Sequence, residues 1–337
     1  MIYEISLNFG GFRKSSNHVA KNLKYFLIPL LLSITAWGGN NFLKDKLTNF
    51  FYWHEMAANP ILLAAQERQM SFRDNIRNLK PLRDKNVPDL EMTAKSALSI
   101  LIDGQGRERV LFEKEKNIRL PIASLTKLMT AKIVLDNYDL SKKIRTSKEA
   151  IAQEEDFGKL SAGKLLSVEY LLYPLLMESS NDAAYALAND YGGMTEEKFV
   201  GLMNKKARDL KMFETQFFNS SGLDIDEPAE IANYSSSLDL ARLAENLLEE
   251  SLIWEILSLE KFDSYGPELI NINKLLGKIP NMLGGKTGYT EKASGTFLLV
   301  MKSPRSKGYI INVILGSEDK FLEMENLINW VNTAYLW

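Results

Sequence analysis

From residue 92 onward, the hydrophobic pattern predicts strands at both ends of the chain. Short runs rich in apolar and β-branched residues, bounded by Gly and Pro, are typical of strands. Residues 96–103 and 109–113 form such a pair around the turn Gly104-Gln105-Gly106. Three more strands are predicted over residues 286–290, 296–302 and 309–317.

Between these strands, apolar residues recur at helical spacing. A helix is predicted from residue 124 to about residue 137, because Leu125, Leu128, Met129 and Ile133 would share its buried side. Thr195 is expected to begin another helix. Further helices are predicted over residues 165–177, 182–190, 237–250 and 321–336.

This order of elements predicts an α/β (α+β) fold. The simplest packing places all the strands in one antiparallel sheet, flanked by the first and last helices, with the middle region as an inserted all-helical subdomain. A cleft would then lie between the edge of the sheet and the helical part.

The N-terminal region has a different pattern. Residues 25–43 carry no charge and follow a basic arm, residues 1–24. This asymmetry predicts a cytoplasmic N-terminus and an extracytoplasmic remainder. The segment fits a transmembrane anchor in the cell membrane, a cleaved signal peptide that leaves a secreted or periplasmic protein, or a buried helix of a cytosolic protein. The charged residues 44–91 are predicted to form a stalk, and residues 92–337 the globular domain.

Composition excludes several kinds of function. A net charge of −2 argues against a nucleic-acid-binding protein, which normally carries a basic face. The chain has no cysteine, and its two histidines, His18 and His54, lie in the N-terminal region. Disulfides are therefore absent and a zinc site is not expected, so we predict neither a metal nor a cofactor.

Three short motifs suggest nucleophilic chemistry without histidine. In chain order they are Ser124-x-x-Lys127, Ser179-x-Asn181 and Lys286-Thr287-Gly288. Each is weak by itself, since Ser-x-x-Lys and Ser-x-Asn also occur elsewhere in this chain. Together they predict acyl transfer through a serine ester, with lysine replacing histidine as the base.

The predicted elements suggest a role for each motif. Ser124 would lie at a helix start, where unpaired N–H groups favour an oxyanion, and Lys127 would lie one helical turn away. Burial and the second cation, Lys286, would favour the neutral amine of Lys127. Ser179 could pass the proton to a leaving amine, and Asn181 could bind a substrate amide. The strand around Thr287 and Gly288 could bind an extended peptide, and its cation and hydroxyl suit a carboxylate.

The segments around these motifs resemble one known family. The chain is similar to the D-alanyl-D-alanine carboxypeptidases of the low-molecular-mass penicillin-binding proteins, within the serine β-lactamase-like superfamily. The resemblance rests on residues 121–131, 175–184, 219–223, 234–236 and 285–290. It implies a β-lactamase/transpeptidase-like fold, a peptidoglycan stem peptide ending in D-Ala-D-Ala as substrate, and covalent inhibition by β-lactam antibiotics. It also implies an oxyanion hole formed by the backbone N–H groups of Ser124 and Tyr289. Lys320 stands where the family often has a carboxylate-binding arginine.

Three alternatives remain at this point. A D,D-endopeptidase of the same family would cut cross-links. A class A β-lactamase-like hydrolase would need a Glu-x-x-x-Asn loop, and the stretch from Glu227 to Asn233 is superficially similar. An inactive muropeptide-binding module would keep the motifs without catalysis.

Overall fold

The computed structural model describes residues 81–154, 160–225, 231–263, 267–304 and 308–337. They belong to the second of two compact units, Asn78–Trp337. The predicted basic arm, the predicted anchor and most of the predicted stalk lie outside the described residues. Within the described ranges, no helix is long and apolar enough to cross a membrane.

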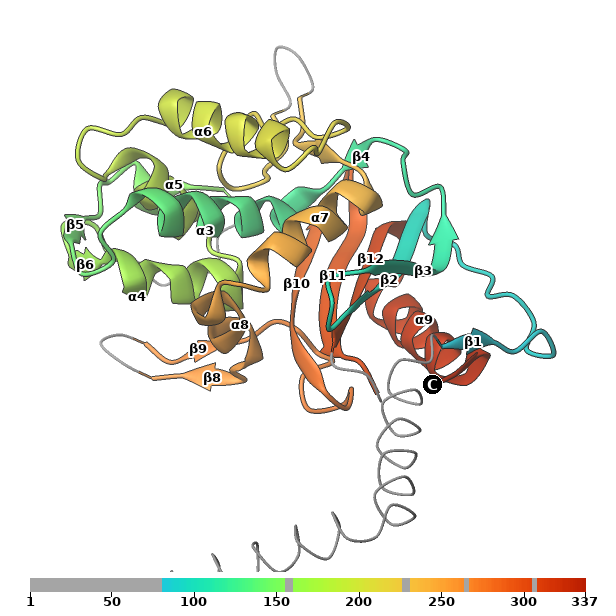
Figure 1. Cartoon of the computed structure of the whole chain (residues 1–337). Coiled ribbons are helices and arrows are strands. Elements are labelled where there is room, and N and C mark those ends of the chain that lie inside the picture. The colour runs from blue at the N-terminus through green and yellow to red at the C-terminus, as the bar shows by residue number, and fades with distance from the viewer. Residues whose placement is uncertain (1–80, 155–159, 226–230, 264–266, 305–307) are drawn as a thin grey trace, which may run out of the picture. The chain divides into compact units, whose positions relative to one another are not determined.

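A five-stranded antiparallel sheet joins the two ends of this unit, as the sequence predicts. The strand order is β10-β11-β12-β2-β3, so the C-terminal strand β12 pairs directly with the N-terminal β2 (Figure 1). Their bounds are β2 Ser96–Asp103, β3 Glu108–Lys114, β10 Met282–Thr290, β11 Ser294–Lys302 and β12 Gly308–Ser317.

Both faces of the central strands are buried, which explains their nearly continuous apolar sequences. Successive side chains of a strand point to opposite faces. On β2, Leu98 and Ile100 join one hydrophobic cluster, whereas Ala97 and Leu101 join a second one. The first cluster extends into the helical part of the unit, and the second lies under the C-terminal helix.

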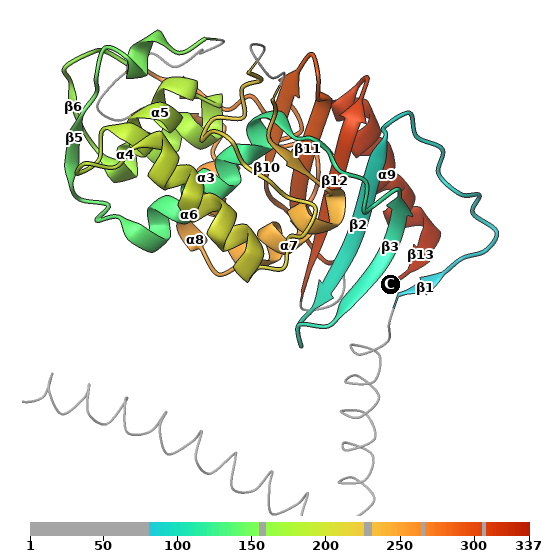
Figure 2. The ribbon, with the colours of Figure 1, turned by 90° about the horizontal axis from the view of Figure 1, so that it is seen from above.

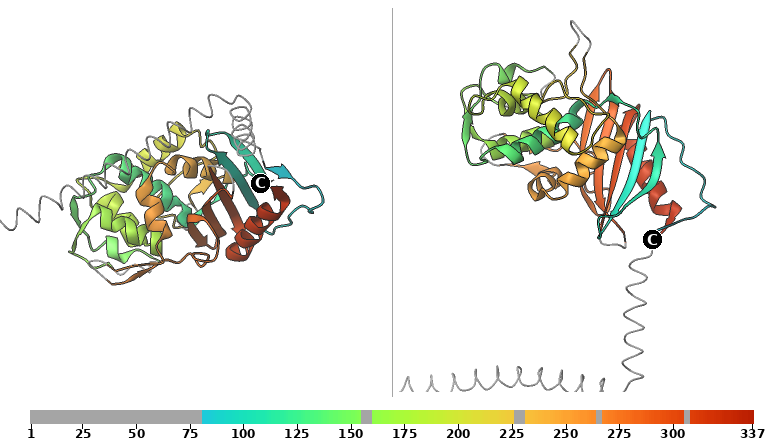
Figure 3. Two further views of the ribbon diagram at one scale, coloured as in Figure 1. Left: turned by 60° about the horizontal axis from the view of Figure 1, so that its bottom comes forward. Right: turned by 45° about the horizontal axis from the view of Figure 1, so that its top comes forward.

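Helices cover both faces of the sheet, but the prediction that the first helix would flank it was wrong. The C-terminal helix α9 contacts β11 and β12, α7 contacts β12 and β2 on the opposite face, and α8 contacts β10 (Figure 3). The first helix, α3, is instead the centre of the helical part beside the sheet (Figure 2). The bounds are α3 Thr126–Asn137, α4 Val168–Tyr173, α5 Asn181–Asn189, α6 Glu196–Asp209, α7 Ser237–Leu247, α8 Ser251–Ser258 and α9 Lys320–Ala334.

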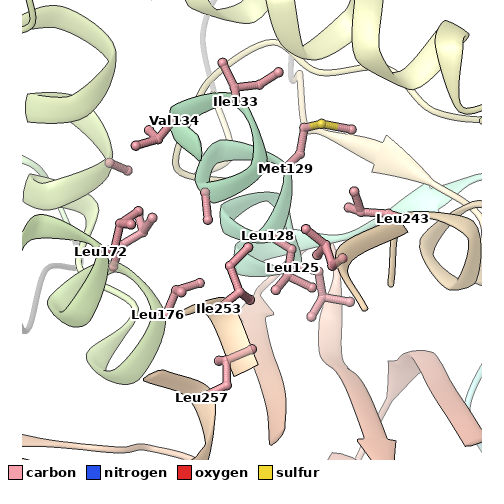
Figure 4. Packing of buried hydrophobic residues seen from close by; sticks show 14 of the residues in the cluster. Leu125, Leu128, Met129, Ile133, Val134, Leu172, Leu176, Leu243, Ile253 and Leu257 are labelled. Carbon is pink, nitrogen blue, oxygen red and sulfur yellow. The ribbon is translucent and has the colours of Figure 1, made fainter. Parts of the chain in front are cut away.

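The central position of α3 follows from its burial on all sides. Every residue from Thr126 to Val134 is buried. Leu128 and Met129 pack among side chains of the surrounding helices (Figure 4). Lys127 is therefore enclosed by the packing of its own helix, whereas most lysines lie at the surface.

The predicted helix over residues 165–177 was wrong in part. Leu165–Ser167 is a short strand, β6, which pairs with β5, Lys143–Arg145. The Ser167 side chain then accepts a hydrogen bond from Tyr170 N and begins α4. A single π-helical turn, Pro174–Glu178, follows α4 and ends at Ser179.

Two other predicted helices were too long. The helix predicted over residues 237–250 ends at Leu247, and α8 follows as a separate helix that was not predicted. The helix predicted over residues 321–336 ends at Ala334, because Tyr335–Leu336 forms β13 and pairs with β1, Leu82–Arg83. The remaining short pairs are β4 Leu120–Pro121 with β7 Tyr234–Ser235, and β8 Lys261–Phe262 with β9 Leu269–Ile270.

Residues 81–91, assigned to the stalk from sequence, contact the C-terminal helix. The Arg83 guanidinium lies 4.8 Å from the centre of the Trp330 ring. Trp330 Nε1 donates a hydrogen bond of 2.8 Å to Pro88 O. Together with the β1–β13 pair, these contacts attach the segment to the sheet unit.

Candidate active site

Ser124 lies at a strained turn between β4 and α3. A single 3-10 turn, Ala123–Leu125, precedes the helix, and Ala123 has a φ of 46°. This left-handed conformation costs a non-glycine residue roughly 1–2 kcal/mol. The carbonyl of Ala123 is held by Thr126 Oγ1, which donates to it at 2.7 Å. The turn therefore fixes the position of Ser124 at the start of α3.

The buried amine of Lys127 has a defined orientation. Its Nζ lies 3.0 Å from Ser124 Oγ, 2.7 Å from Asn181 Oδ1 and 2.7 Å from Ser221 O. The two oxygens of Asn181 and Ser221 can only accept, so Lys127 donates to both. A neutral amine then has both hydrogens engaged, and its lone pair remains for the Ser124 hydroxyl. This is the arrangement that a general base for Ser124 needs.

The side chain of Asn181 accepts a hydrogen bond from the Lys127 amine. Its Oδ1 accepts from Lys127, and its Nδ2 donates to Glu154 O at 2.8 Å. This second contact fixes which end of the amide faces the lysine. The predicted contact between Asn181 and a substrate amide stays a prediction.

Ser179 and Lys286 form a second hydroxyl–amine pair. Ser179 ends the π-helical turn in a left-handed conformation, with φ at 65°. Lys286 Nζ, on β10, lies 2.8 Å from Ser179 Oγ and 2.8 Å from Thr287 O. Burial lowers the pKa of Lys286 well below its ordinary value, and the positive charges that Lys127 and Lys320 carry when protonated lower it further. Lys286 can therefore exchange a proton more readily than an exposed lysine.

Glycine allows β10 to approach the nucleophile. A β-carbon at Gly288 would lie 2.9 Å from Ser124 N and 2.5 Å from Thr296 Oγ1. One at Gly285 would lie 2.9 Å from the Phe297 ring. Both glycines thus have a close-packing role. The next residue, Tyr289, is 62% exposed, and β10 is an edge strand of the five-stranded sheet, so an extended peptide can align along it.

Lys320 lies beside the third motif, at the start of α9. Its Nζ is 5.4 Å from the centre of the Tyr289 ring. Burial lowers the pKa of Lys320, Lys274 lowers it further, and Asp319 opposes both. The cation predicted to replace the family's arginine is therefore close to Tyr289.

Sequence reasoning missed two parts of the site. One is the Ser221 carbonyl, which accepts from Lys127. The other is the role of Asn233, considered from the sequence only as the end of a deacylating loop; it is 1% exposed and contacts the segment carrying the nucleophile. The resemblance had identified residues 219–223 without giving them a role. Glu227, considered for a deacylating loop, lies outside the described residues.

The described residues contain no cluster of three or more His, Cys, Asp or Glu side chains that could bind a metal ion. The site residues described above offer hydroxyls, amines and backbone groups. All three predicted motifs converge: Lys127 contacts both Ser124 and Asn181, Lys286 contacts Ser179, and Gly288 lies against Ser124 N.

Comparison with known proteins identifies similar peptidases and penicillin-binding proteins. The sequence is 33% identical over 245 residues to D-alanyl-D-alanine carboxypeptidase DacF of Bacillus subtilis, covering 69% of this chain and 60% of that protein. It is 35% identical over 213 residues to a D-alanyl-D-alanine endopeptidase of Haemophilus influenzae, covering 61% of this chain and 70% of that protein. The structure resembles cefotaxime-bound penicillin-binding protein D2 of Listeria monocytogenes, with a TM-score of 0.61, 28% identity, and coverage of 73% of this chain and 99% of that one.

One protein family matches the sequence over most of the unit described above. It matches residues 83–319 and is described as D-alanyl-D-alanine carboxypeptidase. The match includes all three motifs and both pairs of hydroxyl and amine. It ends at Asp319, directly before Lys320. The chain therefore belongs to the D-alanyl-D-alanine carboxypeptidase family.

Proposed function

We propose that this protein removes the terminal D-alanine from peptidoglycan stem peptides that end in D-Ala-D-Ala, and that β-lactam antibiotics acylate it. The observation that carries the proposal is the orientation of Lys127, whose contacts with Asn181 Oδ1 and Ser221 O leave the amine lone pair for Ser124 Oγ. Family membership and the β-lactam-bound relative support it.

Acylation would begin with attack by Ser124 on the carbonyl of the penultimate D-alanine. Lys127 accepts the hydroxyl proton, and a bond forms between Ser124 Oγ and the carbonyl carbon. The backbone N–H groups of Ser124 and Tyr289 would stabilise the resulting oxyanion. Removing one such donor typically slows a serine hydrolase by about 10²–10³-fold.

Collapse of the tetrahedral intermediate would expel the amine of the terminal D-alanine. That amine needs a proton, and Ser179 would pass on to it the proton that Lys127 took from Ser124, so that Lys127 and Ser179 both return to their starting states. Lys286 Nζ lies 2.8 Å from Ser179 Oγ and supports this relay. The lowered pKa of Lys286 assists this transfer. Water then hydrolyses the serine ester and regenerates Ser124. Thr287 and Lys320 would bind the terminal carboxylate, since one supplies a hydroxyl and the other a positive charge.

A direct test is digestion of purified cell-wall fragments with mass analysis of the products. Loss of one alanine from each stem supports the carboxypeptidase. Conversion of cross-linked dimers into monomers would instead support the endopeptidase, the activity named for the Haemophilus relative. Rapid turnover of penicillin with neither peptide product would support a β-lactamase-like hydrolase, and no reaction with either substrate would support a muropeptide-binding module.

We also propose that residues 25–43 anchor the protein in the cell membrane with the catalytic unit outside. The charge-free segment and the basic arm before it support this topology. The full-length protein should resist extraction by high salt and be accessible to protease from the outer face. A mature N-terminus near Gly39 would show signal cleavage instead, and an intact cytosolic protein would contradict both possibilities.

A further inference from the structure

Asn233 connects the nucleophile segment to the loop that orients Lys127. Its Oδ1 accepts hydrogen bonds from Phe218 N at 2.6 Å and Asn219 N at 3.2 Å. Its Nδ2 donates to Thr126 Oγ1 at 3.0 Å and to Asn219 O at 2.9 Å. Backbone N–H groups can only donate, so these contacts fix the orientation of the amide.

The backbone of Asn233 reaches the same segment. Its carbonyl accepts from Ile122 N at 3.0 Å, two residues before Ser124. The side chain contacts Thr126, two residues after Ser124. One buried residue therefore contacts the chain on both sides of the nucleophile, although Asn233 itself is not near Ser124 in the sequence.

The loop held by Asn233 carries an acceptor for the base. Asn219 Oδ1 accepts from Gly222 N at 2.7 Å and closes a turn. That turn presents Ser221 O to Lys127 Nζ at 2.7 Å. Gly222 has a φ of +91°, and a β-carbon there would lie 2.1 Å from Ala123 O, so the turn packs tightly against the nucleophile segment.

We propose that Asn233 is a positioning residue for acylation. By joining Thr126 to the Asn219 turn, it holds the Ser221 carbonyl where it takes one hydrogen of the Lys127 amine. The lone pair of that amine is then directed at Ser124. Asn233 acts through these groups, so it should change the rate of the chemical step and leave substrate binding unchanged. This inference rests on the proposed function, since it assigns a role within that acylation.

Asn204 provides a matched control. It lies on α6, and its side chain donates to Phe217 O at 2.8 Å and accepts from Phe217 N at 2.9 Å. It thus ties down the same stretch of chain, one residue before the Phe218 contact of Asn233. Its hydrogen bonds do not involve Thr126 or the Asn219 turn. Loss of stability is common to both asparagines, whereas loss of acylation rate is expected for Asn233 alone.

The test compares Asn233→Ala and Asn204→Ala by stopped-flow reaction with a fluorescent penicillin. Saturation with the penicillin separates the dissociation constant of the first complex from the first-order acylation rate. For Asn233→Ala we expect a rate loss of about 30-fold or more, in line with the cost of misplacing a catalytic group by about 1 Å, and a dissociation constant within about twofold of wild type. For Asn204→Ala both constants should stay within about twofold of wild type, with thermal unfolding measured in parallel.

Two results would overturn the proposal: an unchanged acylation rate in folded Asn233→Ala, or an equal rate loss in Asn204→Ala. Should Asn233→Ala fail to fold, Asn219→Ala opens the same turn from a half-buried position, by removing the acceptor for Gly222 N. It should show the same rate loss, and an unchanged rate would overturn the proposal equally. A wild-type protein that penicillin does not acylate would instead refute the proposed function itself.

Discussion

The two lysines of the site come from different parts of the fold and are controlled differently. Lys127, on the central helix α3, donates hydrogen bonds to two oxygens that can only accept. These bonds direct the lone pair of its neutral amine at Ser124 Oγ. Lys286, on the edge strand β10, is distinguished by its surroundings, because burial and then the neighbouring amines of Lys127 and Lys320, when protonated, lower its pKa. Hydrogen bonds in the helical part thus orient one amine, whereas burial and nearby charge on the sheet lower the pKa of the other.

The largest effect should come from the nucleophile. Ser124→Ala should abolish labelling by penicillin, because it removes the hydroxyl that would form the ester. The free energy of unfolding should change by about 1 kcal/mol or less, because no side chain caps the N-terminus of the 3-10 turn Ala123–Leu125 or of α3. Gel labelling with a fluorescent penicillin and a thermal melt check both points. Labelling that survives would move the nucleophile, and Ser161 and Ser258 would then be substituted in turn.

Lys127→Arg should reduce acylation to at most a few per cent of wild type. A guanidinium stays protonated and offers no lone pair to Ser124 at usable pH. Lys132→Arg is the matched control, since Lys132 lies on the same helix and forms ion pairs with Asp136 and Glu250. That variant should acylate at a rate close to wild type. Substantial acylation by Lys127→Arg would assign the role of base to another group, with Ser179 as the first candidate.

On the sheet side, Gly288→Ala should slow acylation by about 10-fold or more. Its β-carbon would meet Ser124 N and Thr296 Oγ1, which pushes β10 away from the nucleophile and from the expected oxyanion position. Gly201→Ala is the control, because a β-carbon there meets nothing within 4 Å on helix α6. It should leave acylation unchanged and stabilise the protein by up to about 1 kcal/mol. An active Gly288→Ala would show that the close approach of β10 is dispensable.

Lys320→Arg should improve the use of D-Ala-D-Ala peptides at alkaline pH by a few-fold. The pKa of Lys320 is lowered, so wild type loses this positive charge at a lower pH than an ordinary lysine would, whereas arginine keeps it. The expected change is a lower KM at alkaline pH values below the ordinary lysine pKa of about 10.4, with a similar kcat. Identical pH profiles of KM for the two proteins would show that Lys320 does not bind the substrate carboxylate.

The smallest effect concerns stability. Because the pKa of Lys286 is lowered by folding, the folded protein binds fewer protons there than the unfolded chain does. Stability should therefore rise with pH from the lowered folded pKa up to the unfolded value of about 10.4. Lys286→Met carries no charge at this position and should reduce the rise in stability with pH. Some of the rise should remain, because folding also lowers the pKa of Lys320. Parallel thermal melts across this pH range give the difference, and equal slopes would contradict the shift.

The sequence predicted the sheet and the helix of the nucleophile well, because both depend on local patterns. The strand predicted at residues 96–103 is β2, and the other predicted strands differ from the observed ones by a few residues. Errors arose where distant chain segments decide the structure. Tyr335–Leu336 would extend α9 by its local pattern, but pairing with Leu82–Arg83 makes it a strand. Leu165–Ser167 was misassigned for the same reason, since its partner is Lys143–Arg145.

For the candidate site, the sequence by itself predicted which groups would carry the chemistry. With no histidine after His54, a serine hydrolase needs another base, for which lysine is the usual substitute, and three motifs gave the candidate residues. Only the tertiary structure decided how these groups act together. It brings Asn181 and Ser221 to Lys127, and Asn233 to Thr126, across long separations in sequence. The direction of a lone pair depends on such contacts, and no local pattern of residues encodes them.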